Sequence, residues 1–258
     1  EAAALALRIG DEELHSRAAL RLADLDRPAE SDALIDDAED VELPAGDTAE
    51  ETSEPATRLP VVEAQLPSHA ADRVPPGQHV TSRWPVLHQG PIPKFDPAEW
   101  RLTIGGATKG PFGLTYEELK SLGPIEMRSD FHCVTGWSKL DNVWTGVQTK
   151  VLLDRAVPKE GASHVLVGAS FGYTANVPIE VLYDDEAVLA WAHNGKDLAP
   201  KHGFPLRLVV PKLYAWKSVK WVRSFEVLEN DRRGFWELRG YHNEADPWRE
   251  ERYSYQER

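Results

Sequence analysis

The tryptophans and the charges of this 258-residue chain are distributed so unevenly that they divide it into two parts. All nine tryptophans lie from Trp84 onward, whereas residues 1–54 carry 17 acidic and 4 basic residues, a net charge of −13. Residues 55–258 carry 25 charges of each sign. A packed core needs large apolar side chains, so we expect the core in the second part. The acidity belongs to the first part and says little about what the core region binds.

These differences predict three segments. Residues 1–27 have the loosely amphipathic pattern of a candidate docking helix, which Gly10 interrupts. Residues 28–78 are expected to form a disordered acidic linker, because the eleven acidic residues from Glu30 to Glu54 are accompanied by no basic or aromatic residue. Residues 79–258 are expected to form one folded domain.

Composition also bears on whether the chain spans a membrane, binds nucleic acid or resides in a reducing compartment. No run of about 18 apolar residues occurs, so we expect no membrane span. The balanced charge of the second part does not suggest a nucleic-acid surface. A single cysteine fits a reducing compartment, and we expect a cytoplasmic protein. The first residue is Glu rather than Met, so removal of an export signal and a periplasmic location stay open.

The second part alternates between short strand and helix patterns, which indicates an α+β fold with mixed sheets. Residues 80–99 contain four prolines and are expected to be extended and irregular. Helices are expected at 115–122, where Thr115 and Glu118 form a capping-box pattern, at 148–156 and at 178–183. Strands are expected at 100–104, 124–131, 165–167, 187–192, 206–210 and 219–227, with a hairpin turn at Asn194-Gly195.

Cys133 is the only cysteine of the chain and lies in the stretch FHCVTGWS, residues 131–138. A lone thiol cannot form an intrachain disulfide, and free cysteine is often a small core residue. Two basic segments, 201–207 and 217–221, offer side chains that could hold a phosphate: Arg207, Lys217 and Lys220. A soft thiolate beside a phosphate-anchored cofactor would suit a transition metal. On the residues alone, core packing and a plain basic surface stay open.

The chain from about Val80 onward resembles the molybdopterin-binding domain of the sulfite oxidase superfamily, most of all its short bacterial sulfite-oxidase-like branch. The matching segments are VLHQGPIP (86–93), CVTGWS (133–138), HGFPLRLVVP (202–211), YAWKSVKW (214–221) and GFWELRGYHNEADPW (234–248). They follow one another in the order that the family shows, which is more specific than any one of them.

The resemblance implies a molybdenum-molybdopterin cofactor and a role for each matching residue. Cys133 would be the thiolate ligand of the metal, and Tyr173 would overlook the metal as a second catalytic residue, although a core tyrosine on a strand is the alternative. The cofactor-binding positions that it implies are His88, His132, His202, Arg207, Lys217, Ser218, Val219 and Lys220.

Two departures from the family pattern bear on the substrate and the loop. Sulfite oxidases carry arginines after the cysteine that bind the sulfite dianion, but residues 134–138 contain none. The stretch is closer to that of bacterial protein-methionine-sulfoxide reductase catalytic subunits, so an S-oxide or N-oxide is favoured over sulfite. Ala215 replaces a glycine common in the second anchoring loop and restricts its backbone.

We therefore expect a molybdopterin-dependent oxidoreductase that transfers an oxygen atom on a small or protein-borne oxo-substrate. No haem-binding or flavin-binding pattern is visible, so two electrons are expected to be exchanged with a separate electron-transfer protein or domain. The acidic N-terminal part is a candidate for recruiting that partner. The alternatives are a cofactor-holding module within a larger assembly and a metal-free phosphate binder.

Other chemistries fit these residues less well. A zinc site lacks a second cysteine and an HExxH pattern. Ser170 lacks the preceding glycine of a nucleophile elbow. Asp184-Asp185-Glu186 is more typical of a solvated turn than of a cation site. No GxGxxG or Walker pattern occurs, which disfavours a nicotinamide or ATP domain.

Overall fold

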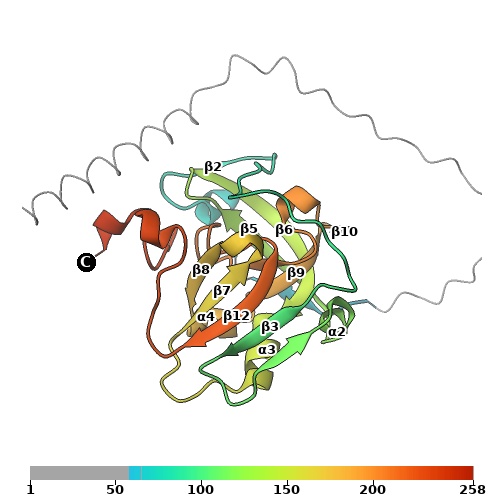
Figure 1. Ribbon diagram of the computed structural model, residues 1–258. Helices are drawn as coiled ribbons and strands as arrows, with labels where there is room; N and C mark the ends of the chain where they lie inside the picture. The colour runs from blue at the N-terminus through green and yellow to red at the C-terminus, as the bar shows by residue number, and fades with distance from the viewer. Residues whose placement is uncertain (1–57, 65, 258) are drawn as a thin grey trace, which may run out of the picture. The chain divides into compact units, whose positions relative to one another are not determined.

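Two β-sheets form the framework of the computed structural model, which describes residues 58–64 and 66–257 (Figure 1). The seven-stranded sheet has the order β1-β5-β6-β9-β10, with β2 paired to β6 and β11 paired to β9. Its strands are β1 (Val61–Glu63), β2 (His79–Val80), β5 (Ile125–His132), β6 (Trp137–Gln148), β9 (Val188–His193), β10 (Lys196–Asp197) and β11 (Arg207–Val209). β1 and β2 run parallel to their partners, whereas the other pairs are antiparallel.

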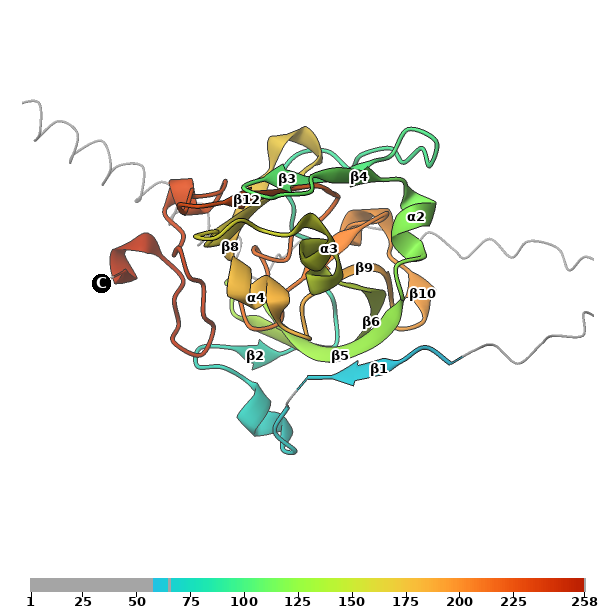
Figure 2. The ribbon, with the colours of Figure 1, turned by 90° about the horizontal axis from the view of Figure 1, so that it is seen from below.

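The second sheet has five strands in the order β4-β3-β12-β7-β8, in which β3 and β12 are parallel. Its strands are β3 (Leu102–Gly106), β4 (Phe112–Leu114), β7 (His164–Ala169), β8 (Thr174–Pro178) and β12 (Val222–Leu228). Figure 2 shows β3, β4 and β12 on the side opposite β5 and β6. The two mixed sheets confirm the predicted α+β fold class.

Short helices connect the strands. The α-helices are α2 (Tyr116–Lys120), α3 (Thr149–Ala156) and α4 (Ile179–Tyr183), and the 3-10 helices are η1 (Ala70–Arg73), η2 (Ser170–Gly172), η3 (Pro200–His202), η4 (Glu237–Arg239) and η5 (Ser254–Gln256). α2 begins with the predicted capping box, in which Thr115 Oγ1 accepts from Glu118 N at 3.2 Å and Glu118 Oε2 accepts from Thr115 N at 2.8 Å. Over the described residues, no helix has the length and apolar character needed to cross a membrane.

Alternate residues of β9 enter two hydrophobic clusters, because successive side chains of a strand point to opposite faces. Leu189 and Trp191 belong to the cluster that both sheets share, whereas Val188 and Ala190 belong to a second cluster. The second cluster also contains Met127, Phe131, Cys133, Trp144 and Tyr214. Asn194 and Gly195 adopt positive φ angles of 49° and 75° and join β9 to β10, which confirms the predicted hairpin.

The folded part begins before residue 79, which corrects the expected end of the linker at residue 78. β1 pairs with β5, so residues 61–63 add a strand to the seven-stranded sheet. Arg73 in η1 donates from Nε and Nη2 to the buried Asp130 carboxylate at 2.8 and 2.5 Å. Contacts with β5, rather than apolar residues of its own, hold this segment. The expected docking helix at 1–27 and linker residues 28–57 lie outside the described residues.

β6 is the longest strand, and the sequence pattern did not predict it. The register of its pairing shifts twice, between Ser129 and Phe131 of β5 and, against β9, between Thr145 and Gly146, which pair with Ala192 and Ala190. Asp141 adopts a positive φ of 57° within the strand. These irregularities disturb the alternation of buried and exposed side chains from which a strand is recognised.

Candidate active site

Cys133 lies directly after β5, at the start of a tight loop that leads into β6. Cys133 N donates to Trp137 O at 2.9 Å, and Gly136 N donates to Cys133 O at 3.0 Å. Gly136 adopts a φ of 93°, a conformation that favours glycine. The Cys133 side chain is buried, and its Sγ accepts a hydrogen bond from Thr135 Oγ1 at 3.2 Å. The loop therefore holds the thiol at a defined place.

The two basic segments predicted to hold a phosphate meet at Arg207 and Lys220, which form an antiparallel backbone bridge. Arg207 is 3% exposed, and its Nη1 donates to His202 O at 3.0 Å. Lys220 Nζ donates to Lys201 O at 2.7 Å. Gly203 permits this approach, since a Cβ there would lie 3.1 Å from Arg207 Cβ. The fold thus brings His202, Arg207 and Lys220 together.

The charges of this cluster act on the thiol. Burial raises the pKa of Cys133, while the hydrogen bond from Thr135 and the charge of Arg207 oppose the rise. Burial also lowers the pKa of Arg207 to about 10, and burial together with Arg207 lowers the pKa of Lys220 to about 7. Two partly or fully desolvated cations beside a thiol favour an anionic ligand at this place.

Aromatic rings pack against the cluster of His202, Arg207 and Lys220. Trp84 stacks on His202, with ring centroids 3.9 Å apart and ring planes 8° apart. The Arg207 guanidinium lies 4.9 Å from the Phe131 ring and 5.6 Å from the Trp84 ring. Burial lowers the pKa of His202 to about 3, so this imidazole is neutral near pH 7. Sequence reasoning missed Trp84; a lone tryptophan in a proline-rich, irregular segment was the available signal.

The other histidines and Tyr173 occupy distinct positions. Tyr173 donates from its phenol to Trp216 O at 2.7 Å, and burial raises its pKa, so it stays protonated. The His88 ring lies 5.1 Å from that of Trp221, the residue after Lys220. His132 is buried, its Nδ1 lies 2.8 Å from Ser138 Oγ, and burial lowers its pKa to about 4. The contact of His132 with Ser138 thus joins the two ends of the cysteine loop.

Three predicted cofactor positions are engaged in other contacts. Lys217 is buried, and its Nζ contacts Asn176 O, Asn176 Oδ1 and Glu237 Oε1 at 2.8, 2.8 and 2.6 Å, which uses all three of its donors. Ser218 Oγ accepts from Val210 N at 3.0 Å, and Val219 is a core residue. The structure therefore places these side chains in internal contacts rather than beside Arg207.

Several buried polar atoms around Cys133 lack a hydrogen-bond partner among the described residues, namely Arg207 Nε, His202 Nδ1 and Trp137 Nε1. Buried polar groups are usually hydrogen-bonded, so unpaired ones point to a bound group. A pterin phosphate offers acceptors for Arg207, and the soft Cys133 thiolate suits molybdenum. These residues therefore fit the molybdenum-molybdopterin group: Cys133 would hold the metal, and Arg207 and Lys220 would hold the phosphate.

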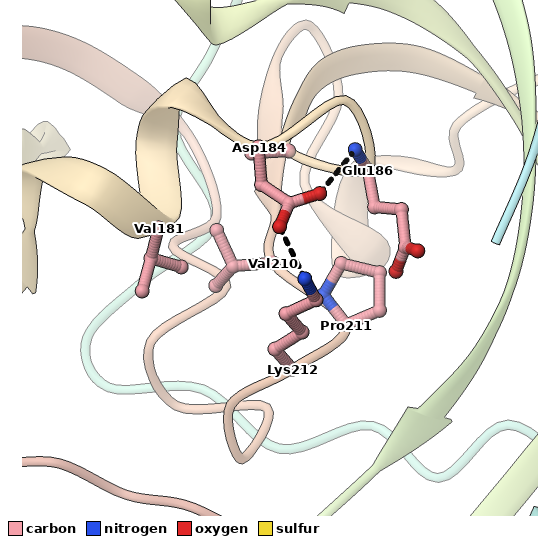
Figure 3. Close-up of a pocket in the computed structure, with 7 residues that line it drawn as sticks. Val181, Asp184, Glu186, Val210, Pro211 and Lys212 are labelled. Carbon is pink, nitrogen blue, oxygen red and sulfur yellow. Dashed lines mark hydrogen bonds and ion pairs between the residues drawn. The ribbon is translucent and has the colours of Figure 1, made fainter. Parts of the chain in front are cut away.

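A separate shallow pocket lies beside α4 (Figure 3). Asp184 accepts from Glu186 N at 3.1 Å and pairs with Lys212, while Asp185 pairs with Lys150. Two carboxylates of the acidic triplet are thus neutralised by lysines, which agrees with a solvated turn. Within the described residues, no three His, Cys, Asp or Glu side chains gather into a metal-binding group.

Comparison with known families and proteins links these observations. A family model described as oxidoreductase molybdopterin binding domain matches residues 89–236. The oxidoreductase YuiH of Bacillus subtilis is 44% identical over 73% of this chain and 96% of its own length. The residues that the family model matches contain the cysteine loop and the two basic segments.

More distant relatives have names that refer to different enzyme activities. Nitrate reductase [NADH] 2 of Phaseolus vulgaris is 28% identical over 57% of this chain, which spans 20% of that enzyme. A protein of Azospira oryzae named as subunit YedZ1 of a protein-methionine-sulfoxide reductase is 25% identical over 58% of this chain and 57% of its own. The sulfane dehydrogenase SoxCD of Paracoccus pantotrophus shares the fold, with a TM-score of 0.51 and 24% identity over 55% of this chain and 41% of its own.

Proposed function

This chain belongs to the oxidoreductase molybdopterin-binding domain family, and we propose that it transfers an oxygen atom on an S-oxide or N-oxide substrate. It is a molybdopterin-dependent oxidoreductase, and the molybdenum-molybdopterin cofactor supplies the centre that exchanges an oxygen atom and two electrons. We further propose that a separate protein or domain supplies or removes these electrons. The name of the Azospira oryzae relative as a subunit supports a separate partner.

The chain's own residues divide the work of this site. Cys133 binds the metal as a thiolate, and the charge of Arg207 with the Thr135 hydrogen bond favours that deprotonated form. Arg207 and Lys220 hold the phosphate of the cofactor, while His202 presents its neutral ring. Tyr173 keeps its proton, and its phenol donates a hydrogen bond to Trp216 O within the electrostatic reach of Arg207.

The single observation that carries the choice of substrate is the composition of the cysteine loop. Residues 134–138 contain no cation, and Trp137 is buried with an indole N–H that has no partner among the described residues. A neutral donor suits a neutral oxo-group better than a dianion, because a buried dianion requires cationic partners. The sulfoxide reductase name of one relative supports the same choice.

The test is metal analysis and turnover of the wild-type protein and Cys133→Ser. We expect the wild type to contain molybdenum and pterin and to reduce methionine sulfoxide or trimethylamine N-oxide with a reduced viologen dye. Cys133→Ser should lose more than the roughly 10–100-fold typical of an outer-shell change, and Thr135→Val, the matched control, should stay within that range.

Three outcomes would contradict the proposal. Faster turnover of sulfite than of any S-oxide or N-oxide would reverse the choice of substrate. Full activity of Cys133→Ser would exclude the thiolate ligand. A wild-type protein that carries the cofactor but turns over no oxo-compound would favour a cofactor-holding module.

A further inference from the structure

The backbone of the cysteine loop is held from outside by two segments that lie beyond the family match at 89–236. The first segment precedes β2. Gln78 Nε2 donates to Cys133 O at 3.0 Å, and Gln78 Oε1 accepts from Ser138 Oγ at 3.3 Å. The next residue donates from its backbone, His79 N to Gly136 O at 2.8 Å. One glutamine amide therefore bridges the first and last residues of the loop.

The second segment is the C-terminal tail. Arg252 Nη1 donates to Val134 O, and Arg252 Nη2 lies 3.4 Å from Gly77 O. The Arg252 guanidinium also lies 5.0 Å from the Tyr214 ring, and its side chain is 15% exposed. A single side chain thus joins the loop, the residue before Gln78 and the buried second cluster.

The segment before β2 and the C-terminal tail pack closely against each other at Gly77. Gly77 adopts a φ of 68°, and a Cβ there would lie 2.7 Å from Glu250 Oε1 and 3.0 Å from Arg252 Nη2. The positive φ favours glycine at this position, and the absence of a side chain lets Glu250 and Arg252 approach. The segment before β2 and the C-terminal tail therefore meet closely beside the cysteine loop.

We propose that Gln78 and Arg252 are positioning residues that fix the conformation of residues 133–138 and so the direction of the Cys133 thiol. As a statement about metal binding, this rests on the proposed role of Cys133 as ligand. The carbonyls of Cys133 and Val134 belong to the two peptide groups that directly follow the Cys133 Cα, and on the other side Cys133 N donates to Trp137 O. Anchoring both peptide groups restricts rotation about the Cys133 backbone, which preorganises the thiol.

The test uses Gln78→Glu and Arg252→Lys in the full chain. Glu keeps the length of Gln78 and its acceptor for Ser138, but it presents an acceptor instead of a donor to Cys133 O. Lys keeps the charge of Arg252 but lacks the fork that reaches Val134 and Gly77 together. His79→Ala is the matched control, because the His79 side chain is exposed and its backbone bond remains.

Two readouts are measured besides turnover. Iodoacetamide alkylation of cofactor-free protein reports on Cys133 alone, since the chain has one cysteine. We expect both variants to react about tenfold faster than wild type, the factor that loss of one hydrogen bond allows. In cofactor-loaded protein, the thiolate-to-metal charge-transfer absorption should shift in both variants and stay unchanged in His79→Ala.

Wild-type alkylation rates in Gln78→Glu and Arg252→Lys would overturn the proposal, and so would an equal acceleration in His79→Ala. Failure of the proposed function looks different. If Cys133 is not the metal ligand, the charge-transfer band is absent from the wild type, while the two variants still accelerate alkylation.

Discussion

At the scale of single residues, the reactivity of Cys133 depends on neighbours that are distant in the sequence. Burial raises the pKa of its thiol, and the positive charge of Arg207 acts in the opposite direction. Arg207 reaches this place because β11 pairs with β9, and both belong to the same sheet as β5, the strand that ends directly before Cys133. The thiolate that a metal requires is therefore favoured by a cation from another strand.

This balance predicts the pH dependence of Cys133 alkylation in cofactor-free protein. In wild type, the midpoint should lie above the value of about 8.5 of a free cysteine, because burial disfavours the thiolate. Arg207→Met removes the charge that favours the thiolate, so its midpoint should rise further. Arg207→Lys keeps the charge and should stay near wild type. A lower midpoint in Arg207→Met than in wild type would contradict this account.

The basic segments were recognisable from sequence because their charged residues are local and dense. The structure separates them: Arg207 and Lys220 meet, whereas Lys217 pairs with Glu237. The residues around a lysine do not show whether its side chain binds a phosphate or a buried carboxylate 20 residues away. The stacking of Trp84 on His202 could likewise not be predicted, because His202 is 118 residues further along the sequence.

At the scale of elements, the close pairing of β6 with β9 depends on Gly146. A Cβ at this position would lie 2.3 Å from Leu189 O and 2.8 Å from Ala190 Cα, both backbone atoms of β9. Gly146→Ala should therefore lower the free energy of unfolding by at least about 1–3 kcal/mol. Gly113→Ala in β4 is the control, since its Cβ would find its nearest atom, Leu102 O, at 3.7 Å.

Urea unfolding followed by tryptophan fluorescence measures both variants. Gly113→Ala should be neutral or slightly stabilising, because alanine loses less conformational entropy than glycine on folding. Equal midpoints for the two variants would show that β6 and β9 can separate enough to admit a methyl group.

Elements with local signals were predicted, and elements that depend on partners were not. The capping box of α2 and the Asn194-Gly195 turn are encoded by a few adjacent residues. The pairing of β6 shifts register against both β5 and β9, so its own pattern is irregular. β1 has three residues and becomes a strand only through the backbone of β5.

At the scale of the whole molecule, the buried pair of Arg73 and Asp130 joins the N-terminal segment to the sheet. Arg73→Met would leave the Asp130 carboxylate, which is 3% exposed, without its bidentate cation. We expect a loss of about 3–5 kcal/mol in the free energy of unfolding. Adding Asp130→Asn removes the stranded charge and should recover much of that loss.

The same urea experiment measures this cycle, with Arg83→Met as a control at an exposed arginine outside the pair. Additive effects of Arg73→Met and Asp130→Asn would mean that the pair contributes no coupling energy. A large coupling would show that residues 58–80 unfold together with the domain that carries the site.

The position of β1 also affects how separate molecules behave toward one another. Glu126 N donates to Pro60 O at 2.9 Å, and Ala64 N donates to Arg128 O at 3.0 Å, so β1 occupies the open edge of β5. An uncovered strand edge is a template for strands of other chains and a starting point for aggregation. β1 itself is short and follows Pro60, which has no N–H to offer. A protein shortened to begin after Ala64 would therefore expose β5 and self-associate through it.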